Sequence, residues 1–274
     1  MRLSISNIAW DVAEDEQIAA LLASAGVDAI DIAPGKYFPQ PAQATEQQAL
    51  AVRDAWRARG IEITGMQALL FGTSGLNVFG DAASQAALLD HLEAVCRIAG
   101  WLGAPRLVFG SPKNRDRSGL DEQQAHAMAE VFFRRLGDIA QAHGVIICLE
   151  PNPTCYGANF MTNAAETARV VRLVDHPAVR MQFDTGALAI NDEDPFAVLA
   201  DCAELIGHVH ASEPQLVPLG DGATDHARMA AALARYLPEQ IVAIEMVATA
   251  DQAHGQAIVR ALDVATRHYR GAQA

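Results

Sequence analysis

The segment "VIICLEPNP" (residues 145–153) runs five apolar residues into a glutamate and then into a proline. A continuous apolar run is typical of a strand that is buried on both faces, as in a parallel sheet. Proline cannot donate a hydrogen bond to a neighbouring strand, so Pro151 favours an end of the strand at this point. The run therefore predicts a buried strand that carries the Glu150 carboxylate at its C-terminal end.

The same pattern recurs further along the chain. A lone polar residue at a strand end is common, but four of them at consecutive predicted strand ends suggest a shared purpose. The spacings are 34, 26 and 35 residues (184 − 150, 210 − 184 and 245 − 210), each about one β-α unit. The later runs are "VRMQFDTG" (179–186) with Asp184, "LIGHVHASEP" (205–214) with His210, and "IVAIEMV" (241–247) with Glu245.

Short apolar runs alternate with amphipathic helical patterns along the whole chain. Several helical patterns end on glycine just before the next strand, as Gly26, Gly60 and Gly144 do, and glycine is the usual C-terminal cap. We predict strands at 2–9, 27–32, 61–67, 105–110, 145–150, 179–184, 206–211 and 241–246. We predict helices at 14–25, 45–60, 84–103, 121–144, 163–175, 194–202, 225–237 and 252–269.

This order indicates an α/β fold of the (β/α)8 TIM-barrel type. Eight β-α units in 274 residues match the size of such a barrel. A doubly wound sheet is the alternative, but no G-x-G-x-x-G follows the first strand. We see no Pro/Gly/Ser-rich linker, so we expect residues 1–274 to form a single TIM-barrel domain.

The amino-acid composition indicates which binding partners and which cellular compartment to expect. The net charge is −13, from 20 basic and 33 acidic residues, and it repels a phosphodiester backbone, so nucleic acid is not an expected partner. No apolar run approaches about 18 residues, so no membrane association is expected. We expect a cytoplasmic protein with free thiols, since the cysteines lack C-x-x-C spacing. They are Cys96, Cys148, Cys155 and Cys202.

The four strand-end side chains would meet in a barrel, because the C-terminal ends of all its strands open at one mouth. Three carboxylates held that close raise one another's pKa unless a cation lies among them. Carboxylate oxygens with one imidazole suit one divalent ion, Mn²⁺ first, with Mg²⁺, Co²⁺ and Zn²⁺ as alternatives. His208 lies two positions earlier on the same strand face, and His210 is preferred because it lies nearer the strand end.

The motifs "CLEPNP", "FDTG", "HVHASEP" and "AIEM" resemble those of the sugar isomerase/epimerase superfamily, which has a xylose-isomerase-like TIM barrel. This superfamily includes ketose 3-epimerases and hydroxypyruvate isomerase, and the resemblance covers nearly the whole chain. It implies that Glu150, Asp184, His210 and Glu245 bind one divalent metal ion. It also implies that Glu150 and Glu245 are catalytic and move protons.

The chain departs from the ketose 3-epimerases at three positions. Those enzymes usually carry a glutamate, a histidine and an arginine where this chain has Tyr156, Ala187 and Leu216. A free hexulose is therefore not the expected substrate. The superfamily also contains endonuclease IV, a DNA repair enzyme with three zinc ions, but the third and fourth predicted strands here lack the histidines that it needs.

These residues suit chemistry beside a carbonyl group. A metal ion can polarise a sugar's carbonyl and stabilise the enediolate that forms when a neighbouring proton leaves. We expect an isomerase or epimerase that acts on a sugar or sugar acid, phosphorylated or not. The alternatives are a metal-dependent keto-sugar dehydratase or lyase, and a sugar-binding barrel without turnover. A homo-oligomer is compatible with the sequence.

Further residues at or just past the predicted strand ends are candidates for the pocket. We expect four polar side chains to hydrogen-bond a small-molecule sugar or sugar derivative, although each is equally compatible with a solvated loop. A basic cluster of Lys113, Arg115 and Arg117 could meet a phosphate or a carboxylate. Trp10 and Phe71 are candidates for an apolar wall, with simple packing as the alternative. The four expected substrate-binding residues are Gln67, Lys113, Asn152 and Glu213.

Overall fold

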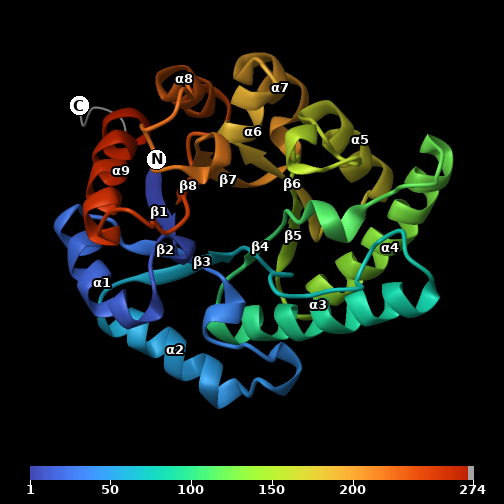
Figure 1. The fold of residues 1–274 in the computed structure, drawn as a ribbon, viewed down its shortest axis with the longest axis horizontal. Coiled ribbons are helices and arrows are strands. Elements are labelled where there is room, and N and C mark those ends of the chain that lie inside the picture. The colour runs from blue at the N-terminus through green and yellow to red at the C-terminus, as the bar shows by residue number, and fades with distance from the viewer. Residues whose placement is uncertain (271–274) are drawn as a thin grey trace.

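The structure, a computed structural model, describes residues 1–270. Its strands form a closed parallel barrel in the order β1 to β8, with β8 paired to β1. Helices surround the strands on the outside (Figure 1). This arrangement confirms the (β/α)8 barrel that the sequence predicts. The strands are β1 Arg2–Ser6, β2 Ala29–Ile32, β3 Glu62–Met66, β4 Arg106–Phe109, β5 Ile146–Leu149, β6 Val179–Asp184, β7 Ile206–Ser212 and β8 Ile241–Glu245.

The helices agree with the predicted ranges apart from one addition. The segment Thr185–Ile190 forms a short helix, α6, which begins directly after β6 and was not predicted. Residues 7–9, predicted as the end of the first strand, form a 3-10 turn, Asn7–Ala9. The other helices are α1 Asp15–Ser24, α2 Glu46–Ala58, α3 Ala82–Leu102, α4 Glu122–Ala142, α5 Ala164–Val174, α7 Pro195–Cys202, α8 His226–Tyr236 and α9 His254–Tyr269.

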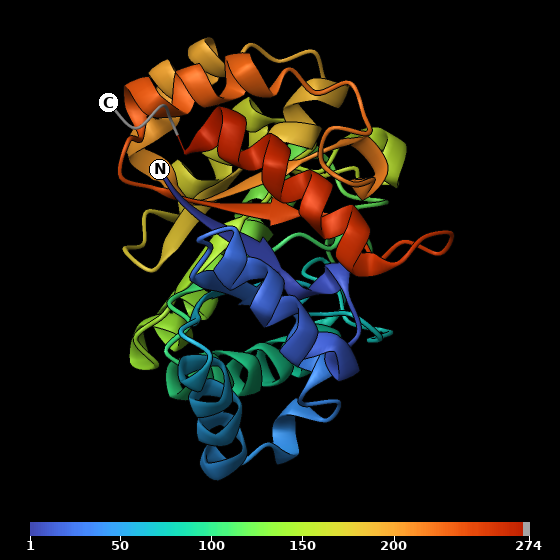
Figure 2. The same ribbon diagram turned by 90° about the vertical axis from the view of Figure 1, so that its left-hand side faces the viewer.

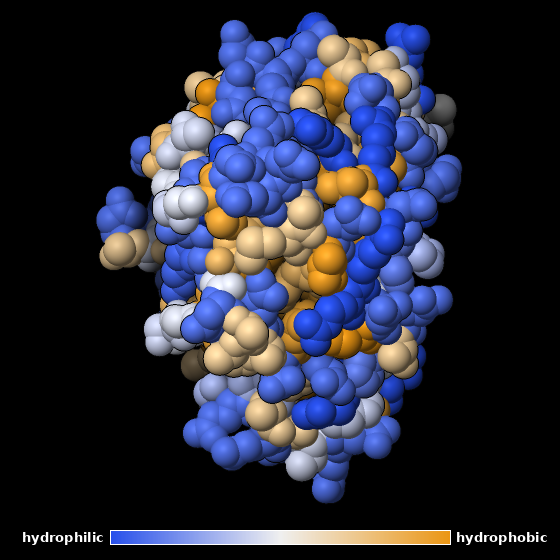
Figure 3. All heavy atoms as spheres, turned by 90° about the vertical axis from the view of Figure 1, so that its right-hand side faces the viewer, coloured by the Kyte–Doolittle hydropathy of each residue, from blue (hydrophilic) through white to orange (hydrophobic). Residues whose placement is uncertain are grey.

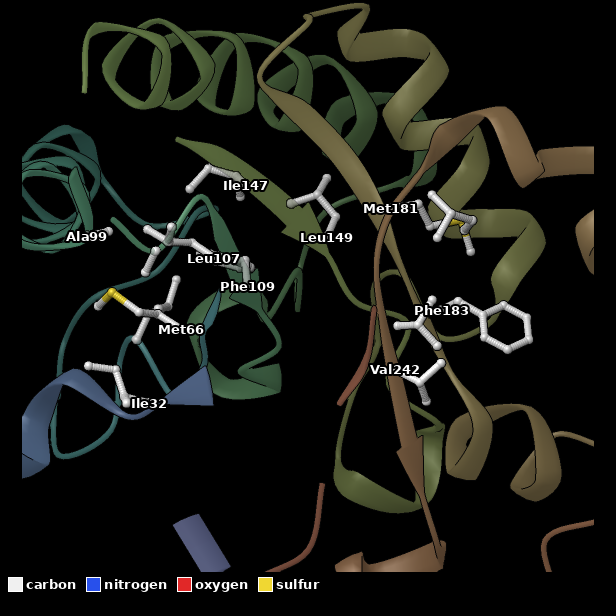
Figure 4. Packing of buried hydrophobic residues seen from close by; sticks show 14 of the residues in the cluster. Ile32, Met66, Ala99, Leu107, Phe109, Ile147, Leu149, Met181, Phe183 and Val242 are labelled. Atoms are coloured by element: carbon white, nitrogen blue, oxygen red, sulfur yellow. The ribbon is translucent and has the colours of Figure 1, made fainter. Parts of the chain in front are cut away.

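Alternate residues of each strand face the helices and form the core. Leu107 and Met66 lie close to Ala99 of α3, and all three are buried (Figure 4). Phe109 of β4 packs edge-on against Phe133 of α4, with ring centroids 5.5 Å apart. This apolar layer between strands and helices is the main source of stability in such a fold.

The inward-facing residues are mostly polar toward the mouth of the barrel. Ser4, Asp31, Gln182 and His208 are all fully buried. Buried polar groups need hydrogen-bond partners. Ser4 Oγ and His208 Nε2 both contact the Asp31 carboxylate, at 3.5 and 2.5 Å. The barrel interior therefore holds a polar network rather than only apolar side chains.

The N-terminus lies beside the end of the last helix, and one loop projects from the barrel. The Met1 amino group donates to the Tyr269 carbonyl at 3.1 Å, which ties the N-terminus to the end of α9. The loop between β8 and α9 projects from the right-hand side in Figure 2. On the side of α4, a strip of apolar residues crosses a largely polar face (Figure 3). The oligomeric state stays a prediction.

The sequence predicts free cysteines and no membrane-spanning segment. Within residues 1–270, none of the helices combines the length and apolar character that crossing a bilayer requires. The four cysteines are all free: Cys96, Cys148 and Cys202 are buried and Cys155 is exposed.

Candidate metal centre and active site

Four side chains from consecutive strands converge at the mouth of the barrel. Glu150 directly follows β5, Asp184 and Glu245 are the last residues of β6 and β8, and His210 lies two residues before the end of β7. One ligand atom from each lies within 4.8 Å of the others. The side chains that the sequence singles out are therefore neighbours, although they lie far apart in the chain.

The cluster is buried and incompletely paired. His210 Nδ1 lies 3.2 Å from Glu245 Oε2 and 3.5 Å from Glu150 Oε1. Glu150 Oε1 is buried without a hydrogen-bond partner. A buried carboxylate oxygen without a partner is costly, and a cation among the carboxylates would remove that cost. The residues present thus fit a bound divalent ion.

The pKa values of the cluster support this fit. Burial and the neighbouring Glu245 and Glu150 carboxylates raise the pKa of Asp184 to about 8. Burial opposes the charged form of His210, but the Glu245 and Glu150 carboxylates outweigh it and raise the His210 pKa well above its ordinary value. These shifts describe negative charge that lacks a matching cation. Three carboxylates and one imidazole are donors that suit Mn²⁺, Mg²⁺ and Co²⁺.

Each of the two glutamates is held by one amide. Gln67 Nε2 donates to Glu245 Oε1 at 2.7 Å, and Asn152 Nδ2 donates to Glu150 Oε2 at 3.2 Å. Arg115 is fully buried behind them: it donates to the Glu150 carbonyl at 2.7 Å and to Asn152 Oδ1. Gln67 and Asn152 also line the pocket, and their contact with substrate stays a prediction. The structure adds that their amides support the glutamates.

Asp184 has partners that the sequence analysis missed. Ser212 Oγ donates to Asp184 Oδ2 at 2.8 Å, and the Ala187 amide donates to Asp184 Oδ1 at 2.6 Å. The second contact makes Asp184 the N-cap of α6, which is the signal by which that helix could have been found. An alanine side chain at Gly186 would place its Cβ 2.6 Å from Ser212 Oγ, so the glycine leaves room for this arrangement.

A second buried cluster lies below the first. His208 Nε2 lies 2.5 Å from Asp31 Oδ2, and His210 Nε2 lies 3.9 Å from the same oxygen. Burial raises the pKa of Asp31, but the charge and hydrogen bond of His208 outweigh it and lower this pKa. A Cβ at Gly65 would lie 2.7 Å from Asp31 Oδ1, so only glycine fits there. Asp31 was missed; an aspartate inside the apolar run "AIDIA" was its signal.

Both carboxylate oxygens of Glu213 have hydrogen-bond partners within the protein. Its Oε1 accepts from the Gly220 amide at 2.9 Å and contacts His226 Nε2 at 3.0 Å, and its Oε2 accepts from the Thr224 amide at 3.0 Å. The side chain is 1% exposed. Both oxygens hold the loop that follows β7. Glu213 also lines the pocket, and its contact with substrate stays a prediction.

The three residues of the basic cluster, Lys113, Arg115 and Arg117, point to different parts of the structure. Lys113 is exposed at the rim of the pocket, where its Nζ donates to the Thr73 carbonyl at 3.0 Å. Arg115 points to the Glu150 backbone, and Arg117 donates to the Asn159 carbonyl at 2.6 Å. Only Lys113 therefore faces the space above the four candidate ligands.

That space is a pocket of about 440 Å³. Three of its lining residues, Tyr156, Ala187 and Leu216, are those that stand in place of polar residues in ketose 3-epimerases. Phe71 also lines it, as the sequence suggests. Trp10 does not: it is fully buried, packs against Trp56 with ring centroids 6.3 Å apart, and donates to Asp15.

Solved structures with the same fold include several sugar epimerases. D-psicose 3-epimerase from Clostridium cellulolyticum H10, with D-tagatose, has a TM-score of 0.81 at 18% identity, covering 98% of each chain. The 3-keto-D-glucoside 4-epimerase YcjR from E. coli has a TM-score of 0.78 at 18% identity, covering 96% of this chain and 98% of that one.

A structure named for a different reaction is also similar. The probable 3-DHS dehydratase AsbF from Bacillus anthracis has a TM-score of 0.74 at 14% identity, covering 97% of this chain and 99% of that one. At these identities the likeness shows the fold alone. No curated protein matches the sequence. The family model of the xylose isomerase-like TIM barrel matches residues 19–266, nearly the whole chain, and the chain therefore belongs to that family.

Proposed function

We propose that this protein is a metal-dependent isomerase or epimerase of a sugar or sugar acid. The observation that carries the proposal is the pair of buried glutamates that face each other across a metal-competent centre, each with its own amide donor. The solved structures with the same fold that are named as a ketose and a keto-glycoside epimerase support this choice.

Glu150, Asp184, His210 and Glu245 would hold the ion, and we propose Mn²⁺ because of the oxygen-rich donor set. When bound, the ion would polarise a substrate carbonyl and offset the charge that develops as a proton leaves. Asp184 is committed to Ser212 and to the α6 amide. It therefore serves as a ligand rather than as an acid or base.

The protons are moved by Glu150 and Glu245. Asn152 fixes Glu150 through Oε2, and Gln67 fixes Glu245 through Oε1. Each glutamate keeps its other oxygen for a second contact, and a carboxylate within reach of the substrate can accept or return a proton. Return to the opposite face of the same carbon gives epimerisation, whereas return to the adjacent carbon gives isomerisation.

Dehydration is the second candidate, favoured by the likeness to a structure named as a probable dehydratase. The same abstraction beside a carbonyl would then be followed by loss of a β-hydroxyl. The small-molecule substrate is the proposed partner, and the cytoplasm is the proposed location.

The test is incubation of the Mn²⁺-loaded protein with keto-sugars in deuterated water, followed by NMR. We expect deuterium at the carbon beside the carbonyl, together with a new epimer or isomer. Loss of water would instead identify a dehydratase. If neither exchange nor water loss occurs while the sugar still binds, the protein is a sugar-binding barrel, and the proposal is wrong.

A further inference from the structure

The upper part of the pocket is lined by apolar side chains, whereas its floor carries the four candidate ligands. We propose that the substrate is a keto-sugar bearing an apolar group, such as an aryl or alkyl glycoside whose ring carries the carbonyl. The inference rests on the proposed function and adds the class of substrate. The apolar residues of the upper part come from four separate segments: Ile8, Leu69, Leu70, Phe71, Tyr156 and Leu216.

Phe71 and Tyr156 are the main argument for an apolar group. Phe71 is 85% exposed and Tyr156 41% exposed, and within residues 1–270 they are the two aromatic members of the exposed large apolar side chains. Both line this pocket. Exposed aromatic rings gathered around one cavity are typical of a site that buries an apolar part of its ligand.

The backbone holds Phe71 in place. The Phe71 amide donates to the Ala68 carbonyl at 3.1 Å, and the Thr73 amide and hydroxyl both donate to the Leu70 carbonyl, at 3.2 and 2.7 Å. Lys113 Nζ binds the Thr73 carbonyl from across the pocket rim. The ring is therefore presented by an ordered turn, and ordering it costs little on binding.

Few polar side chains above the floor could hydrogen-bond a bare sugar: besides Lys113, they are Ser111 and Gln215. The Glu213 carboxylate is engaged by Gly220, Thr224 and His226. The Tyr156 hydroxyl already accepts from the Gln215 amide at 2.7 Å, and Leu216 has no polar side-chain atom. Sugar hydroxyls placed here would lose water without gaining partners, which weakens binding. An apolar group would instead gain from leaving water.

A charged group fits this part less well. Lys113 is the one cation that faces the pocket among its lining residues, and its ammonium is already hydrogen-bonded. Phosphate recognition usually combines several charged or backbone donors on the same oxygens. The rim therefore favours an apolar substituent over a phosphate.

The experiment compares a matched pair of keto-sugars on the Mn²⁺-loaded protein: 4-nitrophenyl 3-keto-β-D-glucoside and 3-keto-D-glucose. Solvent-deuterium exchange at C2 and C4 is measured by NMR, and binding of the unreactive 4-nitrophenyl β-D-glucoside is measured by calorimetry. We expect kcat/KM to be about tenfold or more higher for the aryl glycoside, as for other apolar contacts in a pocket. The unreactive aryl glucoside should bind more tightly than methyl β-D-glucoside.

Substitutions at Phe71 test whether the preference for the aryl glycoside arises in this pocket. Phe71→Ala should reduce the preference for the aryl glycoside about tenfold, and Phe71→Trp should keep it. Val131→Ala, on the remote face of α4, removes an exposed apolar side chain and should change neither value.

The outcomes separate the two proposals. Equal exchange of both sugars, with no effect of Phe71→Ala, would overturn the apolar substituent and leave the proposed function intact. Exchange with neither sugar, together with equal binding of the aryl and methyl glucosides, would overturn both. Exchange with neither sugar while the aryl glucoside still binds preferentially would support the apolar subsite and count against the isomerase. A Phe71→Ala variant that changes oligomeric state without changing preference would place the ring at a subunit interface and overturn the inference.

Discussion

The side-chain amide of Gln67 donates to Glu245 Oε1 at 2.7 Å, although the two residues are 178 positions apart in the chain. The contact joins the end of β3 to the end of β8 across the mouth of the barrel. It gives Glu245 a fixed orientation and stabilises the charged form of its carboxylate. Asn152 does the same for Glu150, so the two proposed acid/base groups are supported in parallel.

We predict that Gln67→Leu lowers turnover by about 10- to 100-fold. The change leaves Glu245 Oε1 without its donor, and a hydrogen bond to a charged group is worth about 1.5–3 kcal/mol. Turnover and bound metal should be measured together, by deuterium exchange and by metal analysis of the purified protein. Gln85→Leu is the matched control, since this amide donates to the Val78 and Gly80 carbonyls outside the pocket. Parental turnover in Gln67→Leu would contradict a role for this donor.

Gly110→Ala tests the space that Glu150 needs. An added Cβ at Gly110 would lie 2.0 Å from Glu150 Oε2, so the carboxylate has to move. A displacement of about 1 Å in an active site can reduce turnover about 10²-fold, and metal affinity should fall as well. Gly35→Ala is the control, because its added Cβ would meet nothing within 4 Å. Equal loss in both variants would point to a general effect of glycine replacement.

Most of the fold could be predicted from the sequence because each strand is buried on both faces. The run at 145–150 is apolar and short, whereas that at 179–184 alternates apolar with polar residues, and their observed counterparts are Ile146–Leu149 and Val179–Asp184. α6 was not found because "TGALAI" follows β6 without a break, and a six-residue helix has too little periodicity to detect.

The sequence alone could not predict which side chains contact the residues at the strand ends. Local patterns indicate which residues end a strand, but not which side chains meet across the barrel. Gln67 and Asn152 were therefore expected to contact substrate or to lie in a solvated loop, and Asp31 was missed although it lies 2.5 Å from His208. Glu213 was assigned to the substrate because it follows a strand. Its real partners, Thr224 and His226, lie in the next loop and helix.

Glu213 should stabilise the fold in a pH-dependent way. Burial raises its pKa, but the hydrogen bonds from His226, Thr224 and Gly220 outweigh burial and lower the pKa to about 2, from an ordinary value of 4.5. A lowered pKa in the folded state stabilises the protein above about pH 4.5, and this contribution is lost as the pH falls toward 2. Glu213→Gln should therefore lower the free energy of unfolding at pH 7, and the difference from the parent should shrink below pH 4.5.

Urea unfolding at pH 7, 4.5 and 3 measures this difference. The exposed Glu16→Gln on α1 is the control and should stay close to the parent at each pH. A difference between Glu213→Gln and the parent that stays constant from pH 7 to pH 3 would show that the carboxylate charge is not what stabilises the loop.

Asp184→Asn should fail through the metal ion rather than through proton transfer. One carboxylate oxygen of Asp184 accepts from Ser212 and the other from the α6 amide, which orients the side chain and leaves each oxygen a lone pair for the ion. The variant should bind Mn²⁺ at least about tenfold more weakly, in line with losses seen at metal sites. Excess Mn²⁺ should restore much of its turnover. Loss of turnover that persists at saturating, calorimetrically confirmed Mn²⁺ would contradict the purely ligand role.

Glu150→Gln and Glu245→Gln separate proton transfer from metal binding most sharply. Each glutamine keeps the size of the side chain and one oxygen that can face the ion, but it cannot accept and return a proton. Turnover should fall by about 10² to 10⁴-fold in both variants, while metal content at saturating Mn²⁺ stays near that of the parent.

If the glutamates serve opposite faces of the substrate, one variant should still exchange the substrate proton with deuterated water without forming product. That variant has kept the glutamate that abstracts the proton and lost the one that returns it. Exchange and product formation should therefore be followed in the same NMR sample, beside Asp184→Asn. Parental turnover in both glutamine variants would show that neither carboxylate is an acid or base, and the proposed mechanism would be wrong.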